Sequence, residues 1–186
     1  MSAPKMTDHR YTYEEWVRLP EDERLEIEVV EGVLVVSPRG HAFHQRALHN
    51  IVHRLTTGLP VELAPLAEVD VVLARSPLTV RIPDVIVVDS ALAETNPPRF
   101  AGSEVHLAVE VLSAGTRRVD RVMKLAEYAE AGIAQYWIVD LDPPITLRAF
   151  VLVGAGYEAA GEFCGAVVLP VAGCSVRLDV GALTGR

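Results

Sequence analysis

The sequence predicts an α/β fold with a mixed β-sheet core flanked by helices, and with extra β-hairpins at the N- and C-terminal ends. Helix-like and strand-like segments alternate along the chain, and apolar runs such as "VIVVD" and "YWIVD" are typical of strands covered on both faces. A helix between two such runs makes the flanking strands parallel, because parallel neighbours need a crossover connection. The length of 186 residues, half of them hydrophobic, fits a single domain over residues 1–186.

The N-terminal part is expected to form a short helix, a hairpin and a long helix. Thr12 and Glu15 make a capping-box pattern, which indicates a short helix in "TYEEWVRL". The segment "RLEIEVVEGVLVVSP" is typical of a hairpin that turns at Glu31-Gly32. Residues 41–59 have the 3.6-residue periodicity of an amphipathic helix. The residues expected on its apolar face are Phe43, Ala47, Leu48, Ile51 and Leu55.

The rest of the chain is expected to supply most of the sheet. "EVDVVLA" and "LTVRIPDVIVVDS" are predicted to be two strands joined by a turn at Arg75–Pro77. "VHLAVEVLS" is a third strand, and a helix from about Thr116 to Ala131 follows it, ended by Gly132. "AQYWIVDLD" is a fourth strand, and the valine-rich remainder with glycine turns predicts more β structure.

One residue does not fit this scheme, because Glu110 lies in the middle of the apolar strand "LAVEVL". Burying an unpaired carboxylate costs several kcal/mol, so the residue needs a partner or a function. Asp84 begins the preceding apolar run, and two neighbouring carboxylates are typically held together by a hard cation such as Mg²⁺. On the crossover helix, Asp120, Lys124 and Tyr128 share one stripe, from which Lys124 could neutralise a phosphate or help to activate a water.

Simpler interpretations stay open for each of these residues. Asp84 could begin a strand without any chemical role, and Asp120 with Lys124 could be an ordinary ion pair on a helix surface. His44 lies near the centre of the predicted apolar helix face, where a hydrogen-bonded core histidine is commoner than a ligand. Glu28 could belong to a site or could be an exposed carboxylate of the hairpin.

Charge and hydropathy restrict the partners. The formal net charge is −8, which argues against a large nucleic-acid-binding surface. No apolar run approaches the ~20 residues that cross a bilayer, and the N-terminal segment has no signal-peptide core, so we expect a cytoplasmic protein without a membrane. The apolar β segment from about Leu147 onward leaves strand edges to cover, which favours a homo-oligomer, most simply a dimer.

The motifs together resemble a known family. "RIPDVIVVD" followed by "HLAVEVLSAGTRRVDRVMKLAEYAEAGIAQYWIVD" is similar to the Uma-two family of endonucleases, and "IEVVEGVLVVSP" with His44-Gln45 resembles its N-terminal hairpin and helix. The family is placed in the restriction-endonuclease-like, PD-(D/E)XK superfamily, and the resemblance covers nearly the whole chain. It implies a restriction-endonuclease-like fold and a metal-dependent nuclease that hydrolyses phosphodiester bonds of nucleic acid, with DNA favoured over RNA.

The resemblance also implies roles for individual residues. Asp84 matches the metal-binding aspartate and Glu110 the second acid, so that these two and the backbone carbonyl of Val111 would hold Mg²⁺ or Mn²⁺. The superfamily lysine is expected two residues after the second acid, where this chain has Leu112. Lys124 on the following helix matches the family's lysine instead, and its flexible stem can deliver the same charge. Four further positions are expected to support these catalytic residues: Glu28, His44, Asp120 and Tyr128.

An alternative of a different class is a catalytically inactive, self-associating binding protein that keeps the nuclease fold. The acidic net charge favours it, as does the scarcity of basic clusters. Only Arg117-Arg118-Arg121 form such a cluster, at the entry of the predicted crossover helix. Saturable binding of Mn²⁺ that depends on Glu110 would distinguish an active nuclease from this alternative.

Overall fold

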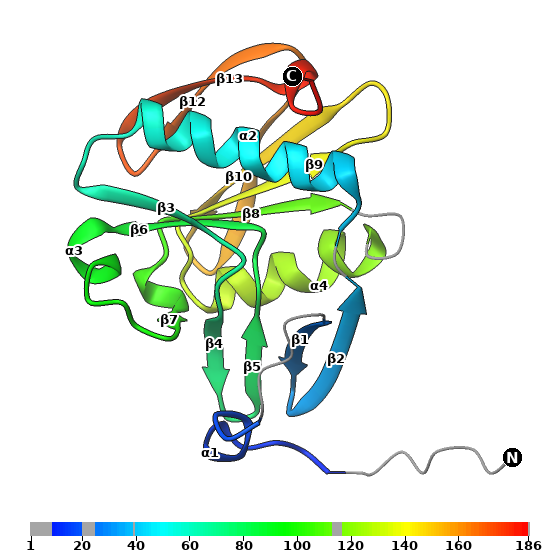
Figure 1. The fold of residues 1–186 in the computed structure, drawn as a ribbon, viewed down its shortest axis with the longest axis vertical. Coiled ribbons are helices and arrows are strands. Elements are labelled where there is room, and N and C mark those ends of the chain that lie inside the picture. The colour runs from blue at the N-terminus through cyan, green and yellow to red at the C-terminus, as the bar shows by residue number, and fades with distance from the viewer. Residues whose placement is uncertain (1–8, 20–24, 39, 113–116, 186) are drawn as a thin grey trace, which may run out of the picture.

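The computed structural model describes residues 9–19, 25–38, 40–112 and 117–185. Side chains are described for these residues except Leu25, Pro38 and 117–122. The architecture is mixed α/β, with two larger sheets and a C-terminal hairpin (Figure 1). In the described parts of the chain, no helix combines the length and apolar character needed to cross a membrane.

The larger sheet has six strands in the order β11-β10-β9-β8-β6-β3. All neighbours are antiparallel except β8 and β9, which are parallel as predicted and are joined by the crossover helix α4 (Arg117–Glu130). Gly132 follows this helix with a φ of +81°, a conformation that favours glycine at a helix end. The strands are β3 (Leu63–Ala67), β6 (Val85–Asp89), β8 (Leu107–Leu112), β9 (Gln135–Asp140), β10 (Thr146–Val153) and β11 (Gly156–Phe163).

The second sheet has five strands in the order β2-β1-β5-β4-β7. Its predicted hairpin is confirmed: β1 and β2 pair around Glu31-Gly32, whose φ angles of 48° and 82° suit a tight two-residue turn. The short helix α1 (Tyr13–Trp16) carries the predicted capping box, with Thr12 as N-cap and Glu15 at the third helical position. The strands are β1 (Leu25–Val30), β2 (Val33–Pro38), β4 (Val71–Arg75), β5 (Leu78–Arg81) and β7 (Phe100–Ala101).

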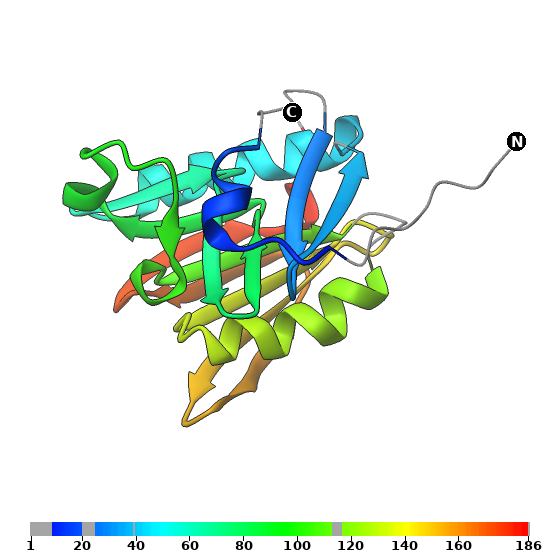
Figure 2. The ribbon, with the colours of Figure 1, turned by 90° about the horizontal axis from the view of Figure 1, so that it is seen from below.

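Helices cover both faces of the six-stranded sheet (Figure 2). Helix α2 (Ala42–Gly58) packs on the face that contains Val109 and Val111, and the hairpin of β12 (Ala166–Val171) and β13 (Cys174–Asp179) completes this core. Helix α4 lies against the opposite face, where Ala108 and Leu112 of β8 belong to a second core cluster. Strand β8 is therefore covered on both faces, and all six of its residues are buried, as the sequence predicted. Three short helices complete the chain: α3 (Ser90–Ala93), η1 (Gly102–Glu104) and η2 (Val180–Ala182).

Three details differ from the sequence-based expectation. The segment "LTVRIPDVIVVDS" forms two strands in different sheets, because the ladder of β5 ends before Pro83, which has no N–H to donate. Strand β3 was not predicted. Phe43 is 63% exposed, because the core contacts of α2 begin one turn later, at Ala47.

Candidate active site

The candidate site lies where β6, β8, β1 and α4 meet near the start of α2. Val85 pairs with Val109 in the antiparallel β6–β8 ladder, so Asp84 precedes the ladder on β6 and Glu110 continues it on β8. One carboxylate oxygen of Asp84, Oδ2, accepts a 2.6 Å hydrogen bond from the backbone N–H of Val111. The break between β5 and β6 thus leaves the Asp84 side chain at the end of a central strand, directly beside β8.

Glu110 has the partners that a buried carboxylate requires. Its side chain lies on the face covered by α4 and is only 4% exposed. Oε1 accepts a 2.6 Å hydrogen bond from the Tyr128 hydroxyl, and Oε2 lies 2.9 Å from the Nζ of Lys124. Burial, followed by the charge of Glu110, holds the pKa of Tyr128 well above its ordinary value, so that this hydroxyl remains a donor.

Lys124 is buried at the centre of this group of charges. It is 5% exposed, and its ammonium lies 2.9 Å from Oε2 of Glu110 and 3.5 Å from Oε1 of Glu28. The predicted stripe on the crossover helix therefore brings Lys124 and Tyr128 to the same carboxylate. The side chain of Asp120, the third member of that stripe, lies outside the described residues.

Glu28 belongs to the same buried group, so its interpretation as an exposed hairpin carboxylate is wrong. It is 6% exposed, and its Oε1 also accepts a hydrogen bond from the backbone N–H of Ile82 at 3.1 Å. Burial alone would raise the pKa of Glu28, but the neighbouring charges of Lys124 and Arg81 outweigh burial and lower it. Glu28 therefore remains an anion beside the lysine.

Arg81 is the central residue that the sequence analysis missed. It is 1% exposed and donates from NH1 to Glu28 at 2.8 Å, and from Nε and NH2 to the carboxylate of Glu127 at 2.7 and 2.9 Å. Burial disfavours the charged form of Arg81, yet these acceptors raise its pKa above the ordinary value. Its position at the end of the strand "LTVR" was only a weak signal, because a charge at a strand end ordinarily reaches solvent.

His44 contacts the other candidate acid. Its Nε2 lies 3.1 Å from Oδ1 of Asp84, whereas the side chains of His49 and His53 on the same helix are exposed. Burial lowers the pKa of His44, but the hydrogen bond and charge of Asp84 outweigh burial and raise it. A Cβ at Gly40 would lie 2.4 Å from Nδ1 of His44, so the close approach of the chain here requires glycine.

A further carboxylate, that of Glu26, lies near the site. Burial raises the pKa of Glu26 to about 7, and the negative charges of Glu28 and Asp84 act in the same direction. The negative charges of the carboxylates in this region therefore exceed the positive charges of Lys124 and Arg81.

The oxygen donors of the site fit a hard divalent ion. Within the described residues, no group of three His, Cys, Asp or Glu side chains is placed to hold a metal. Asp84 and Glu110 do provide two carboxylates on neighbouring strands, and the backbone carbonyl of Val111 is a third oxygen. Mg²⁺ is commonly held by one or two carboxylates while it keeps several waters, so this donor set fits it without a third acidic side chain.

The protein has a mixed α/β fold in which the candidate acids lie beside a buried lysine. The fold resembles a crystal structure described as "a putative nuclease belonging to DUF820" from Anabaena variabilis, with a TM-score of 0.74 and 18% sequence identity. The match covers 94% of this chain and 97% of that chain. The family model for Uma2, described as "Putative restriction endonuclease", matches residues 12–168.

This chain belongs to the Uma2 family, as the sequence motifs predicted. No curated protein matches it.

Proposed function

We propose that this protein is a divalent-metal-dependent nuclease that hydrolyses phosphodiester bonds, with Asp84, Glu110 and Lys124 as its catalytic residues. The single observation that carries the proposal is the 2.9 Å contact between Lys124 and Glu110, both of them buried, on neighbouring α4 and β8. A lysine on the helix thereby reaches the second acid even though Leu112 occupies the usual lysine position. The membership of the Uma2 family supports the same reaction class.

Asp84, Glu110 and the carbonyl of Val111 are the groups that would hold Mg²⁺ or Mn²⁺. When bound, the ion supplies Lewis-acid polarisation of a phosphoryl oxygen and makes a coordinated water more acidic. The N–H of Val111 fixes the orientation of the Asp84 carboxylate, and the hydroxyl of Tyr128 fixes that of Glu110. Both acids are thus held in place before any ligand arrives, which is the preorganisation that catalytic sites need.

Lys124 would act on the charge of the reacting phosphate. In hydrolysis a water oxygen bonds to phosphorus and one P–O bond to a sugar breaks, leaving a phosphate monoester and a sugar hydroxyl. Negative charge accumulates on the phosphoryl and leaving oxygens, and a buried ammonium stabilises it more strongly than an exposed one would. Glu28 lies 3.5 Å from the ammonium and is itself paired with Arg81, so the position of the ammonium does not depend on a flexible stem alone.

The substrate class that fits these groups is nucleic acid, with DNA preferred to RNA on the resemblance to restriction endonucleases. Asp84 and His44 lie near the start of α2, and Lys124 lies on α4, so a phosphate would approach at the ends of β6 and β8 where these residues meet. Because the net charge is −8, we expect a few local contacts with phosphates, and not a broad basic surface, to bind the nucleic acid.

The alternative function is a non-catalytic, self-associating binding protein with the same fold. One observation favours it: each oxygen of the Glu110 carboxylate already has a partner in the protein, Tyr128 for Oε1 and Lys124 for Oε2. In this alternative the charges serve only to satisfy one another in the core.

Calorimetric titration with Mn²⁺ and cleavage of supercoiled plasmid distinguish the two functions. For the nuclease we expect saturable Mn²⁺ binding and metal-dependent nicking, both lost in Glu110→Gln. Glu130→Gln on the exposed surface of α4 removes the same charge and should leave both unchanged. Wild-type protein that neither binds Mn²⁺ nor cuts DNA or RNA would refute the nuclease and leave the binding protein.

A further inference from the structure

A second group of cationic and aromatic side chains lies around α1, at the end of the five-stranded sheet where β5 begins (Figure 1). The guanidinium carbon of Arg75 lies 4.1 Å from the centre of the Tyr13 ring. The guanidinium of Arg99 lies 4.7 Å from the ring of Trp16 and 5.6 Å from that of Tyr13, and its NH1 donates to the Tyr13 hydroxyl at 3.1 Å. Two cations therefore share one aromatic ring.

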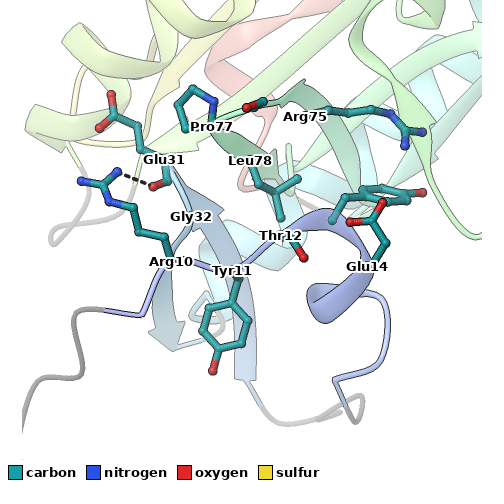
Figure 3. A pocket seen from close by; sticks show the side chains of 11 residues that line it. Arg10, Tyr11, Thr12, Glu14, Glu31, Gly32, Arg75, Pro77 and Leu78 are labelled. Carbon is teal, nitrogen blue, oxygen red and sulfur yellow. Dashed lines mark hydrogen bonds between the residues drawn. The ribbon is translucent and has the colours of Figure 1, made fainter.

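These side chains border two hollows in the surface. The first, of about 340 Å³, is lined by Arg10, by the Glu31-Gly32 turn and by Arg75, and Figure 3 shows Arg10 and Arg75 on opposite sides of it. The second, of about 500 Å³, is lined by Arg75 and Arg99. Tyr13 and Arg75 line both hollows, so the two hollows adjoin at these residues.

The hollows contain acidic as well as basic side chains, because Glu14 and Glu31 line the first and Glu104 lines the second. In the described ranges, neither Arg75 nor Arg99 forms an ion pair with a carboxylate, although acidic residues outnumber basic ones by 25 to 17 in the chain. Glu104, which lines the larger hollow, accepts a hydrogen bond from the N–H of Ala101 at 2.7 Å. Nε of Arg99 is buried without an acceptor among the described residues.

Such an arrangement is incomplete without an anion. Like charges held close together repel, and a buried donor without an acceptor is commonly explained by a missing water or ion. Arginine is the side chain best suited to phosphate, because its planar fork presents several donors at once. The aromatic rings hold the guanidiniums in place, which lowers the entropy lost when a ligand binds.

We propose that Arg75 and Arg99 form an accessory site for the phosphodiester backbone of a nucleic-acid strand, outside the catalytic centre. The inference rests on the proposed nuclease function and adds to it a place where the substrate is held. Strand β5 connects the two regions, from Leu78 beside α1 to Arg81 beside the catalytic lysine. Three residue steps along a strand span about 10 Å, which is the rise of about three nucleotides of a DNA strand.

The experiment measures the fluorescence anisotropy of a labelled single-stranded oligonucleotide with EDTA present, over a series of salt concentrations. Neutralising both side chains in Arg75→Gln/Arg99→Gln should weaken binding and make the slope of log K against log salt shallower by about 0.7 for each lost phosphate contact. Arg177→Gln is the matched control, because Arg177 is exposed on β13, away from α1 (Figure 1). We expect it to bind as the wild type does.

Three further measurements keep the outcome interpretable. Thermal unfolding checks that the double variant is folded. If the double variant is destabilised, the single change Arg75→Gln, at an exposed side chain, should still give about half of the change in salt slope. If the double variant binds the oligonucleotide with the same affinity and the same salt slope as the wild type and the Arg177→Gln control, the accessory site is overturned. Binding of inorganic phosphate that depends on these arginines, without binding of the oligonucleotide, overturns a polynucleotide ligand. If the wild type binds no oligonucleotide at all, the accessory site is overturned, whereas the nuclease proposal is tested separately by Mn²⁺ binding and plasmid cleavage.

Discussion

Replacing Arg81 should destabilise the protein more than any other single charge removal we consider. Arg81→Met keeps much of the apolar stem but removes three charge-assisted hydrogen bonds, one to Glu28 and two to Glu127. Glu28 is then buried with only Lys124 as a cation. Breaking a buried ion pair by removal of one partner typically costs about 3–5 kcal/mol. For a chain of 186 residues this corresponds to a fall in Tm of roughly 6–20 °C.

Urea denaturation followed by circular dichroism measures this cost, and a double-variant cycle tests its cause. If the penalty comes from the uncompensated charge of Glu28, then Arg81→Met/Glu28→Gln should be more stable than the sum of the two single changes predicts, by about 1–3 kcal/mol. Arg177→Met provides the control at an exposed site and should stay within about 0.5 kcal/mol of the wild type. A loss of less than about 1 kcal/mol in Arg81→Met would refute the reasoning.

Three other predictions use the same protein. Lys124→Ala should reduce plasmid cleavage about 10²–10³-fold while Mn²⁺ binding is retained, and Met123→Ala on the exposed side of α4 should cleave normally; equal cleavage by both variants contradicts the role of Lys124. Glu26 has a folded pKa of about 7 against an ordinary 4.5, so its contribution to stability is complete below pH 4.5 and is lost as the pH rises through 7. Unfolding curves at several pH values should show this decline in the wild type and less of it in Glu26→Gln; an identical pH dependence would exclude Glu26. Light scattering should show a dimer, whereas a monomer of 20.2 kDa would contradict the expected self-association.

The sequence predicted the elements that its periodicity describes. The capping box, the Glu31-Gly32 hairpin and the parallel pair around α4 follow from local patterns and from the geometry of a crossover. The break at Pro83 was missed because "LTVR" and "VIVVD" are both apolar runs, and nothing in their composition says that they belong to different sheets. Which sheet a strand joins depends on long-range pairing, and a single sequence does not display that pairing.

The candidate site shows the same division between local and long-range information. Glu110 could be singled out because an unpaired carboxylate in the middle of a buried strand costs several kcal/mol, so it requires a partner or a function. Arg81 ends its strand, where a charge ordinarily reaches solvent, so its burial could not be recognised before the packing of β5 against α4 and β1 was known. The same packing converts Glu28 from a hairpin carboxylate into a partner of Lys124.

The buried charges also connect the fold to the proposed chemistry. A lysine displaced from β8 to α4 must reach the site from a longer distance, and its flexible stem alone would leave the ammonium free to move. Glu28 restrains that ammonium. Arg81 compensates part of the negative charge of Glu28, so Glu28 does not fully neutralise the lysine. The requirement for a second buried cation therefore follows from the position of the lysine. A chain with its lysine two residues after the second acid would hold the ammonium from β8 itself. Leu112→Lys in the Lys124→Ala background should therefore restore part of the cleavage, with Arg81 kept in place to compensate the charge of Glu28.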